Sequence, residues 1–300
     1  MLTEQQRITR QSGLGGSDIA ALFGLSPWIT AYELWLEKTG KISSSYDVDN
    51  PVIEAGNRLE PLIARWYEDV SGNKVHEITE TLRHPDHPYL LAHIDRKVKG
   101  QSKILEIKFA MEFSRKKWGE AGTDQIPLHY ICQVQHYLAV TGNQEADVAV
   151  LFGGWDLKIY HIKRDEKLIS GIIAAAGRFW KENVLAGIAP APVTQEDVMK
   201  MFPQDNGEYL PLSPEIEAKV SDLKALKKKL NFFEKDKKQY EQDIKKWLGE
   251  NQGAINDNGE IVVTWKSSER TRLDEKQMKQ EHPALWQQYA KTNISRTFRT

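Results

Sequence analysis

The sequence predicts an α/β protein in which a mixed sheet is flanked by helices and followed by a long helical appendage. Between residues 15 and 187, segments of helical and strand-like pattern follow one another in the order α-α-α-β-β-β-α-β-β-α, which describes a mixed sheet covered by helices. After residue 189 the composition changes to a Pro-rich stretch and then to a heptad pattern. The chain shows no internal repeat.

The composition is that of an ordinary globular chain with balanced charge. Of the 300 residues, 40% are apolar and 28% are charged, which suits a folded soluble protein. Lys and Arg number 41 against 42 Asp and Glu, and this balance argues against a passive, uniformly basic nucleic-acid coat. It leaves room for an enzyme that keeps acidic groups in a metal site and basic groups along a nucleic-acid track.

The number of cysteines and the hydropathy of the chain exclude further classes of protein. The single cysteine, Cys132, excludes an intramolecular disulfide framework and a multi-cysteine zinc site. No apolar run approaches the ~18 residues that span a bilayer, and the polar start MLTEQQRITRQ is not a signal peptide. We therefore expect a cytoplasmic protein with no membrane partner.

Three helices are predicted near the start of the chain. In SGLGGSDIAALFGLSP a Gly-rich entry leads to Ser17 and Asp18, which are candidate caps for the apolar helix that follows. AYELWLEKTG predicts a second short helix, and residues 41–51 a loop. A third helix is predicted over residues 51–72, with Glu60 beside an apolar face formed by positions 59, 62, 63, 66 and 70.

The sheet is predicted from the middle of the chain. KVHEITETLRHP and YLLAHIDRKVK alternate or run apolar, and GQSKILEIKFA follows a Gly turn. IPLHYICQVQHYLAVTG has the pattern of a helix. ADVAVLFGGWDLKIYHIKRD predicts two strands joined by a Gly-Gly turn, and a helix follows over residues 165–187.

We expect four regions: a core over residues 1–190, a Pro-rich connection over 191–212, a long amphipathic helix over 213–250, and a hairpin followed by a short helix over 251–300. The long helix carries a coiled-coil-like seam, with Lys237 at one core position. The seam residues are Leu223, Leu226, Leu230, Phe233, Tyr240, Ile244 and Trp247.

Several uses of the C-terminal region stay open. The long helix can fold back on the core, associate with a second copy, or dock a partner, and its basic stretches LKALKKKL and EKDKKQ can meet DNA phosphates. The hairpin is predicted with Asn258-Gly259 at its turn, and a short helix is predicted through residues 285–290.

The candidate chemistry lies in AHIDRKVKGQSKILEIKFA, which places Asp95, Glu106 and Lys108 along a predicted hairpin. Charged residues are depleted in strands and are costly to bury without compensation. Glu106 and Lys108 are two apart and project from one face of a strand, while Ile107 faces the core. Two carboxylates there can share Mg²⁺, and the lysine can orient or deprotonate water or offset phosphate charge. This is the chemistry of phosphodiester hydrolysis.

An Asp followed by Glu-x-Lys is a weak signal alone, but three further segments accompany it in order. The chain resembles the PD-(D/E)XK nucleases, and within them the YqaJ-type phage recombination exonucleases related to the lambda exonuclease. The resemblance covers roughly residues 7–185 and is carried by GLGGSDIAALFGLSPWITAYELWLEKTG, GNRLEPLIARWYE, AHIDRKV, LEIK and QVQHYLAVTG. It implies a restriction-endonuclease-like core. The chain departs from many relatives in having Arg96 after the core Asp, where they have Gly.

The resemblance also implies roles for individual residues. Asp95 and Glu106 would be metal ligands, joined by the carbonyl of Ile107, and Lys108 would be the catalytic lysine. Glu60 would be an additional acidic ligand. Gln135 and Tyr137 would orient water or contact the scissile region. Ser17 and Arg10 would form the pocket for a 5′-terminal phosphate.

Each of these residues also has a purely structural interpretation. Ser17 can be only a helix cap, and Glu60 only a solvated helix residue. Gln133 and Gln135 cannot share one helix face, because residues two apart point about 200° apart; of the two we predict that Gln135 faces the site. His93 is expected to be structural, and Cys132 a small buried residue of its helix.

By this resemblance we expect a Mg²⁺-dependent deoxyribonuclease, with Mn²⁺ able to substitute, that degrades double-stranded DNA ends from 5′ to 3′ and leaves 3′ overhangs. The expected partners are a single-strand annealing protein and further copies in a ring-like trimer, in a bacterial host cell. Two alternatives remain: a PD-(D/E)XK endonuclease, and a non-catalytic DNA-binding or assembly module.

Overall fold

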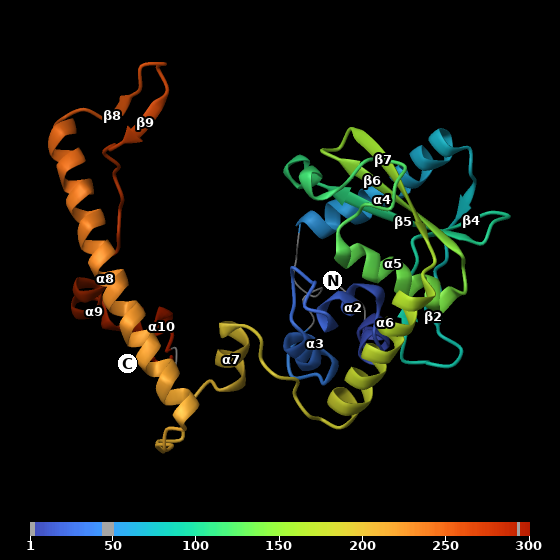
Figure 1. The fold of residues 1–300 in the computed structure, drawn as a ribbon, viewed down its shortest axis with the longest axis horizontal. Coiled ribbons are helices and arrows are strands. Elements are labelled where there is room, and N and C mark those ends of the chain that lie inside the picture. Colours follow the sequence, from blue (N-terminus) through green and yellow to red (C-terminus); the bar gives the residue numbers. More distant parts are fainter. Residues whose placement is uncertain (1–3, 44–50, 293–294) are drawn as a thin grey trace. The chain divides into compact units, whose positions relative to one another are not determined.

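The chain forms two compact units, which divide after Met201. The computed structural model describes residues 4–43, 51–292 and 295–300, and the side chains from residue 8 onward. Figure 1 shows the first unit as a sheet wrapped by helices and the second as a long helix with a hairpin at one end. Among the described residues, no helix has the length and apolar character needed to cross a membrane.

The first unit is built on a five-stranded mixed sheet with the strand order β1-β4-β5-β6-β7. Its strands are β1 (Val75–His76), β4 (Arg96–Val98), β5 (Lys103–Ala110), β6 (Glu145–Phe152) and β7 (Asp156–Lys163). Only β5 and β6 are parallel, with Glu106 opposite Val148, and the other neighbours are antiparallel. A parallel pair needs a crossover connection. The crossover here contains a 3₁₀ turn, η2 (Glu112–Lys117), and helix α5 (Leu128–Thr141).

Helices cover both faces of the sheet. The larger core lies between the sheet and α2 (Gly16–Leu22), α3 (Ala31–Lys38), α5 and α6 (Glu166–Arg178). The smaller core lies on the other face, where α4 (Pro51–Ser71) packs Ile63 and Tyr67 against alternate residues of β5 and β6. This is the predicted fold class, a mixed sheet flanked by helices, and Cys132 is buried in α5 as predicted.

Local sequence explains where the helices begin and end. Thr30 caps α3 by accepting a hydrogen bond from the backbone N–H of Glu33, whose carboxylate accepts one from the N–H of Thr30 in return. Gly142 ends α5 with a φ of +70°, a backbone conformation that favours glycine. The predicted helix over 165–187 is α6 continued by a π-helical segment, η3 (Phe179–Leu185).

Some elements differ from the sequence-based predictions. The strand predicted in KVHEITETLRHP shrinks to β1 and to β2 (Leu82–Arg83), which pairs with β3 (Leu91–Ala92) outside the main sheet. Glutamates at 77 and 80 and prolines at 85 and 88 disfavour a longer strand there. An additional helix, α1 (Glu4–Gln11), precedes the Gly-rich entry.

The core also extends further than residue 190. Helix α7 (Gln195–Met201) docks at the start of α3, where the Thr30 hydroxyl donates to Asp197 Oδ1 at 2.8 Å and Lys200 pairs with Glu33. Asp197 is fully buried. The Pro-rich connection therefore contains a helix that belongs to the first unit, because polar contacts distant in sequence hold it there.

The second unit consists of α8 (Pro214–Leu248), the hairpin β8 (Gly253–Ile255) and β9 (Ile261–Thr264), and two short helices, α9 (Glu275–Glu281) and α10 (Pro283–Tyr289). Ser213 caps α8 by accepting from the N–H of Ile216. Gly259 forms the predicted turn with a φ of +80°. Helix α9 was not predicted. Most of the predicted seam of α8 is exposed, including Leu230 and Phe233.

Candidate active site

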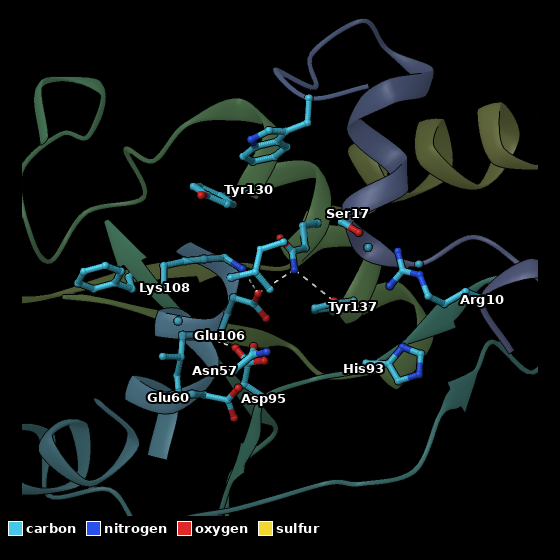
Figure 2. Close-up of a pocket in the computed structure, with 18 of the residues that line it drawn as sticks. Arg10, Ser17, Asn57, Glu60, His93, Asp95, Glu106, Lys108, Tyr130 and Tyr137 are labelled. Atoms are coloured by element: carbon cyan, nitrogen blue, oxygen red, sulfur yellow. Dashed lines mark hydrogen bonds and ion pairs between the residues drawn. The ribbon is translucent and has the colours of Figure 1, made fainter. Parts of the chain in front are cut away.

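A cavity of about 640 Å³ opens beside β5, within the range of roughly 300–1,000 Å³ that is usual for ligand pockets. Its walls come from α1 and α2, from the first half of α4, from the β3–β4 segment, from β5 and from α5. Figure 2 shows the polar side chains that converge on it. They include Arg10, Ser17, Asn57, Glu60, His93, Asp95, Glu106, Lys108, Tyr130, Gln133 and Tyr137.

Strand β5 sorts its side chains as predicted. Ile107 packs against α4 in the smaller core, while Glu106 and Lys108 point to the opposite face and into the cavity. Glu106 is only 2% exposed. Lys108 Nζ lies 2.5 Å from Glu106 Oε1, so the buried carboxylate has a cationic partner.

Asp95 approaches the same point from the neighbouring strand. It precedes β4, which pairs antiparallel with β5, and its Oδ2 accepts a hydrogen bond from the backbone N–H of Ile107 at 2.6 Å. This bond fixes the carboxylate beside Glu106 (Figure 2). The structure therefore brings together the three side chains that the sequence singled out, at positions 95, 106 and 108.

Burial sets the electrostatics of these groups. Burial and the nearby charge of Glu106 raise the pKa of Asp95 well above its ordinary value, and burial raises the pKa of Glu106 despite Lys108. Burial lowers the pKa of Lys108, but the charges of Glu106 and Asp95 outweigh it and raise that pKa above its ordinary value. Lys108 is thus a cation at neutral pH, which favours orienting water or offsetting phosphate charge over abstracting a proton.

The donor set at this point fits a divalent cation. Glu106 Oε2 is buried and receives no hydrogen bond from any part of the chain that the structure describes, a costly state for a carboxylate oxygen. Mg²⁺ is held in proteins by one or two carboxylates and completes its shell with water. Asp95 and Glu106 supply two carboxylates. Within the described ranges, no group of three or more His, Cys, Asp or Glu side chains is arranged to hold a metal ion.

Glu60, the predicted additional acidic ligand, lines the cavity but is held by another partner. Its Oε1 lies 2.6 Å from Nη1 of Arg96, which also donates to the backbone carbonyl of Asp95. Arg96 is buried. Arg96 therefore ties α4 to the segment that carries Asp95.

The expectation that Gln135 faces the site is wrong. Gln135 points away and bridges the chain between β7 and α6, donating to the carbonyl of Lys163 and accepting from the N–H of Asp165. Gln133 takes the position in the cavity. Its Nε2 donates to Glu106 Oε1 at 2.7 Å and to Tyr137 Oη at 3.2 Å. The spacing held the signal: residues four apart, 133 and 137, share a helix face, whereas 135 and 137 do not.

Ser17 and Arg10, the predicted phosphate ligands, both line the cavity, but Ser17 is not the helix cap. Asp18 makes the capping bond, accepting from the N–H of Gly15 at 2.9 Å. Asp18 also pairs with the buried Lys38 at 2.7 Å, and Lys38 donates to the backbone carbonyl of Arg10. This buried pair fixes α1, α2 and α3 together and so holds both predicted phosphate ligands at the cavity wall.

Close packing between α2 and α5 explains the second glycine of the Gly-Gly pair. A Cβ on Gly16 would lie 2.5 Å from the Tyr137 ring and 2.9 Å from Gln133 Cγ. Only glycine lets α2 approach the helix that supports Glu106 this closely.

Sequence reasoning missed several residues of the cavity wall. Trp28 and Tyr130 line it, as do Asn57 and Thr81, and His93 forms part of it near Arg10 while bonding the Thr81 hydroxyl at 2.8 Å. No local pattern marks these residues, because segments far apart in the chain bring them together. The one feature of the sequence that pointed to any of them is Trp28, a large aromatic residue that follows Pro27 in a predicted loop.

The arrangement of an Asp, a Glu-x-Lys strand and a covering helix on a mixed sheet agrees with what the resemblance to the PD-(D/E)XK nucleases implies. Residues 7–144 match the model of the YqaJ-like viral recombinase domain. The uncharacterized protein YqaJ of Bacillus subtilis (strain 168) is 32% identical over 306 residues, which cover 99% of this chain and 94% of that protein. The chain therefore belongs to the YqaJ-like viral recombinase family, and the resemblance is confirmed.

Solved structures with a similar arrangement include exonucleases. LHK-Exo, an alkaline exonuclease from Laribacter hongkongensis solved in complex with dAMP, matches 66% of this chain and 97% of its own with 22% identity and a TM-score of 0.49. A phage-related exonuclease from Haemophilus somnus 129PT matches 58% of this chain and 96% of its own with 14% identity and a TM-score of 0.44.

Proposed function

We propose that the protein is a Mg²⁺-dependent deoxyribonuclease that degrades linear double-stranded DNA from its 5′ ends and leaves 3′ overhangs. Membership of a viral recombinase family supports DNA as the substrate. The observation that carries the proposal is the buried Glu106, whose Oε2 has no donor among the described residues, beside Asp95 and Lys108 in an open cavity. Mn²⁺ is expected to substitute for Mg²⁺.

Each side chain at the site would have a distinct role in hydrolysis. Asp95, Glu106 and the carbonyl of Ile107 would hold the cation, which would polarise the phosphoryl group and activate water. Lys108, protonated, would offset phosphate charge and orient the attacking water. Gln133 holds Glu106 in place from α5, and we assign to it the supporting role first predicted for Gln135.

Arg10 and Ser17 would bind the 5′-terminal phosphate at the far wall of the cavity. Arginine suits phosphate because its guanidinium offers several donors in a planar fork. We expect 5′-phosphorylated ends to be digested at least about tenfold faster than 5′-hydroxyl ends, with the difference lost in Arg10→Ala, since a charge-assisted contact is worth on the order of 1.5–3 kcal/mol. Equal wild-type rates on both ends would reject this pocket.

The test of the function is digestion of a linear duplex labelled at one 5′ end, with and without Mg²⁺. We expect release of labelled mononucleotide from the 5′ end, with Mg²⁺ required. A closed circular duplex serves as the control, because an exonuclease needs an end. Cleavage of the circle would indicate an endonuclease, and no cleavage of either substrate with Mg²⁺ or Mn²⁺ would refute the proposal.

The exposed seam of α8 supports self-association. Its apolar residues repeat at heptad spacing, and all of them except Leu223, which is partly buried, are exposed in the second unit. In a parallel pair of helices, Lys229 would lie opposite Glu234 and Asp222 opposite Lys227 of the second copy, which gives two attractive contacts beside the seam, against one like-charge contact further along. We therefore propose a second copy of this chain as the occupant of the seam.

The remaining partners follow from the family. A viral recombinase that exposes single strands needs a protein that anneals them, and we propose a single-strand annealing protein as the partner. The ring-like trimer stays a prediction from the resemblance. The proposed place of action is the cytoplasm of a bacterial host.

A further inference from the structure

We propose that Trp28 and Tyr130 form a subsite that stacks on the terminal nucleobase of the strand being cut. This inference deepens the proposed function and rests on it. The two rings line the same cavity as Asp95, Glu106 and Lys108, yet neither has a place in the hydrolysis itself.

Backbone hydrogen bonds fix Trp28 in place, while most of its surface is exposed. It lies in the loop between α2 and α3, where the Ser26 hydroxyl accepts hydrogen bonds from the N–H groups of Trp28 and Ile29 at 3.2 and 3.3 Å. The residue is nevertheless 63% exposed. A large aromatic residue that is fixed in place but left exposed on a cavity wall is a marker of binding rather than of core packing.

Tyr130 joins this ring to the catalytic groups. It lies at the start of α5, 6.4 Å from Trp28 between ring centroids, and His129 meets the Trp28 ring at 5.0 Å with planes at 87°. Tyr130 also packs on Trp118, which contacts the buried Phe152. Lys108 Nζ lies 5.1 Å from the centre of the Tyr130 ring (Figure 2).

The position of the rings selects a nucleobase as the ligand. In the proposed function the phosphate at Lys108 is the scissile one, which is esterified to the 3′ oxygen of the terminal nucleotide. The aromatic wall begins beside that lysine, so the base of the terminal nucleotide lies within its reach. Aromatic side chains bind unpaired bases by stacking, and they do so without sequence preference because every base has a π-face. The subsite is therefore expected to accept all four bases equally.

The experiment uses the full chain and measures binding without hydrolysis. Fluorescence anisotropy in EDTA compares two duplexes labelled at the distal end, one with a normal 5′-terminal nucleotide and one in which that nucleotide lacks its base. We expect wild type to bind the normal end about tenfold tighter. Trp28→Leu should bind both ends equally, and Trp28→Phe should keep the preference.

The same variants are then assayed for digestion in Mg²⁺, with Trp155→Leu as a matched control. Trp155 is 68% exposed on the turn between β6 and β7 and is not among the lining residues of the cavity. Trp28→Leu should slow digestion of normal ends about tenfold and leave abasic ends unaffected, and Trp155→Leu should match wild type on both.

Two results would overturn the subsite: equal wild-type affinity for the two ends, or a loss in Trp28→Leu that is as large on abasic ends as on normal ones. The second would make Trp28 a purely structural residue. A wild type that prefers the normal end in EDTA but cuts no DNA with Mg²⁺ or Mn²⁺ would refute the nuclease function and support the base subsite.

Discussion

At the scale of single residues, the site depends on charges that the fold buries together. Glu106 is held by Lys108 on its own strand and by Gln133 from α5, and one of its oxygens accepts nothing from the described chain. Burying a carboxylate is expensive unless it is paired. If packing were its only role, an apolar residue at position 106 would be more stable. The buried carboxylate of Glu106 is therefore best explained by a role in cation binding.

The first prediction concerns this pair. Glu106→Ala and Lys108→Ala should each lower the rate of DNA hydrolysis at least about a hundredfold, because each removes a group from the reacting centre. The melting temperature, followed by circular dichroism, should show that both variants remain folded. Lys163→Ala, an exposed lysine on β7, is the control and should keep wild-type activity. Substantial residual activity in both site variants would remove the proposed mechanism.

The second prediction concerns pH and the buried His136, whose side chain lies away from the cavity. Burial lowers the pKa of His136 to about 4, although its Nε2 is hydrogen-bonded to the carbonyl of Leu91. The unfolded chain therefore binds a proton between about pH 6.5 and 4 that the folded chain does not, and the free energy of unfolding falls as pH is lowered through this range.

From pH 7 to 4.5 this residue should cost roughly 2 kcal/mol of stability. Urea unfolding at several pH values measures it. His136→Gln, which keeps a donor for Leu91, should show a shallower dependence on pH than wild type. Identical slopes for the two proteins would mean that other groups govern the acid sensitivity.

At the scale of elements, α5 has one face for the site and another for the scaffold. Gln133 and Tyr137 lie toward Glu106, whereas Gln135 secures the junction of β7 and α6. Helical spacing enforces this division, because residues two apart cannot point the same way. The two glutamines are chemically identical, so the same substitution made at each position in turn separates an effect on the rate of hydrolysis from an effect on stability.

The third prediction uses that pair. Gln133→Leu should reduce the rate of hydrolysis about tenfold with a small change in melting temperature. Gln135→Leu should keep the rate and lower the free energy of unfolding by about 1–3 kcal/mol, since two backbone groups lose their partner. Steady-state rates and urea unfolding of both variants provide the readouts. The reverse pattern would restore the original prediction for Gln135.

At the scale of the whole molecule, the two units differ in how they use apolar side chains. The first unit buries them in two cores on either side of its sheet. In the second unit most of the seam of α8 is left exposed, including Leu226, Leu230 and Phe233. Exposed apolar rows of this length are typical of association surfaces.

The fourth prediction tests that surface. Leu230→Glu combined with Phe233→Glu should lower the molar mass measured by size-exclusion chromatography with light scattering, because charges replace two core positions of the seam. Lys228→Glu combined with Lys235→Glu, on the opposite face of the same helix, should leave the mass unchanged. A wild-type protein that is monomeric at micromolar concentration would exclude association through α8.

The sequence by itself determined the fold class and the three candidate catalytic residues, Asp95, Glu106 and Lys108, which the structure brings together. Periodicity of 3.6 and of 2 located seven of the ten α-helices that the structure describes and the three long strands β5, β6 and β7, because burial of one face imposes those patterns. It also put Glu106 and Lys108 on one side of β5 and Ile107 on the other, since alternation in a strand is geometric. Short elements such as β1 and α7 were misjudged, because contacts distant in sequence decide them.

Only the tertiary structure decided which of the two glutamines enters the cavity, that Arg96 ties Glu60 to the Asp95 segment, and that Trp28 and Tyr130 share a wall with the acidic site. These relations join α2, α4, β5 and α5. The physical reason is that periodicity tells which way a side chain points from its own element, while its neighbours depend on how separate elements pack.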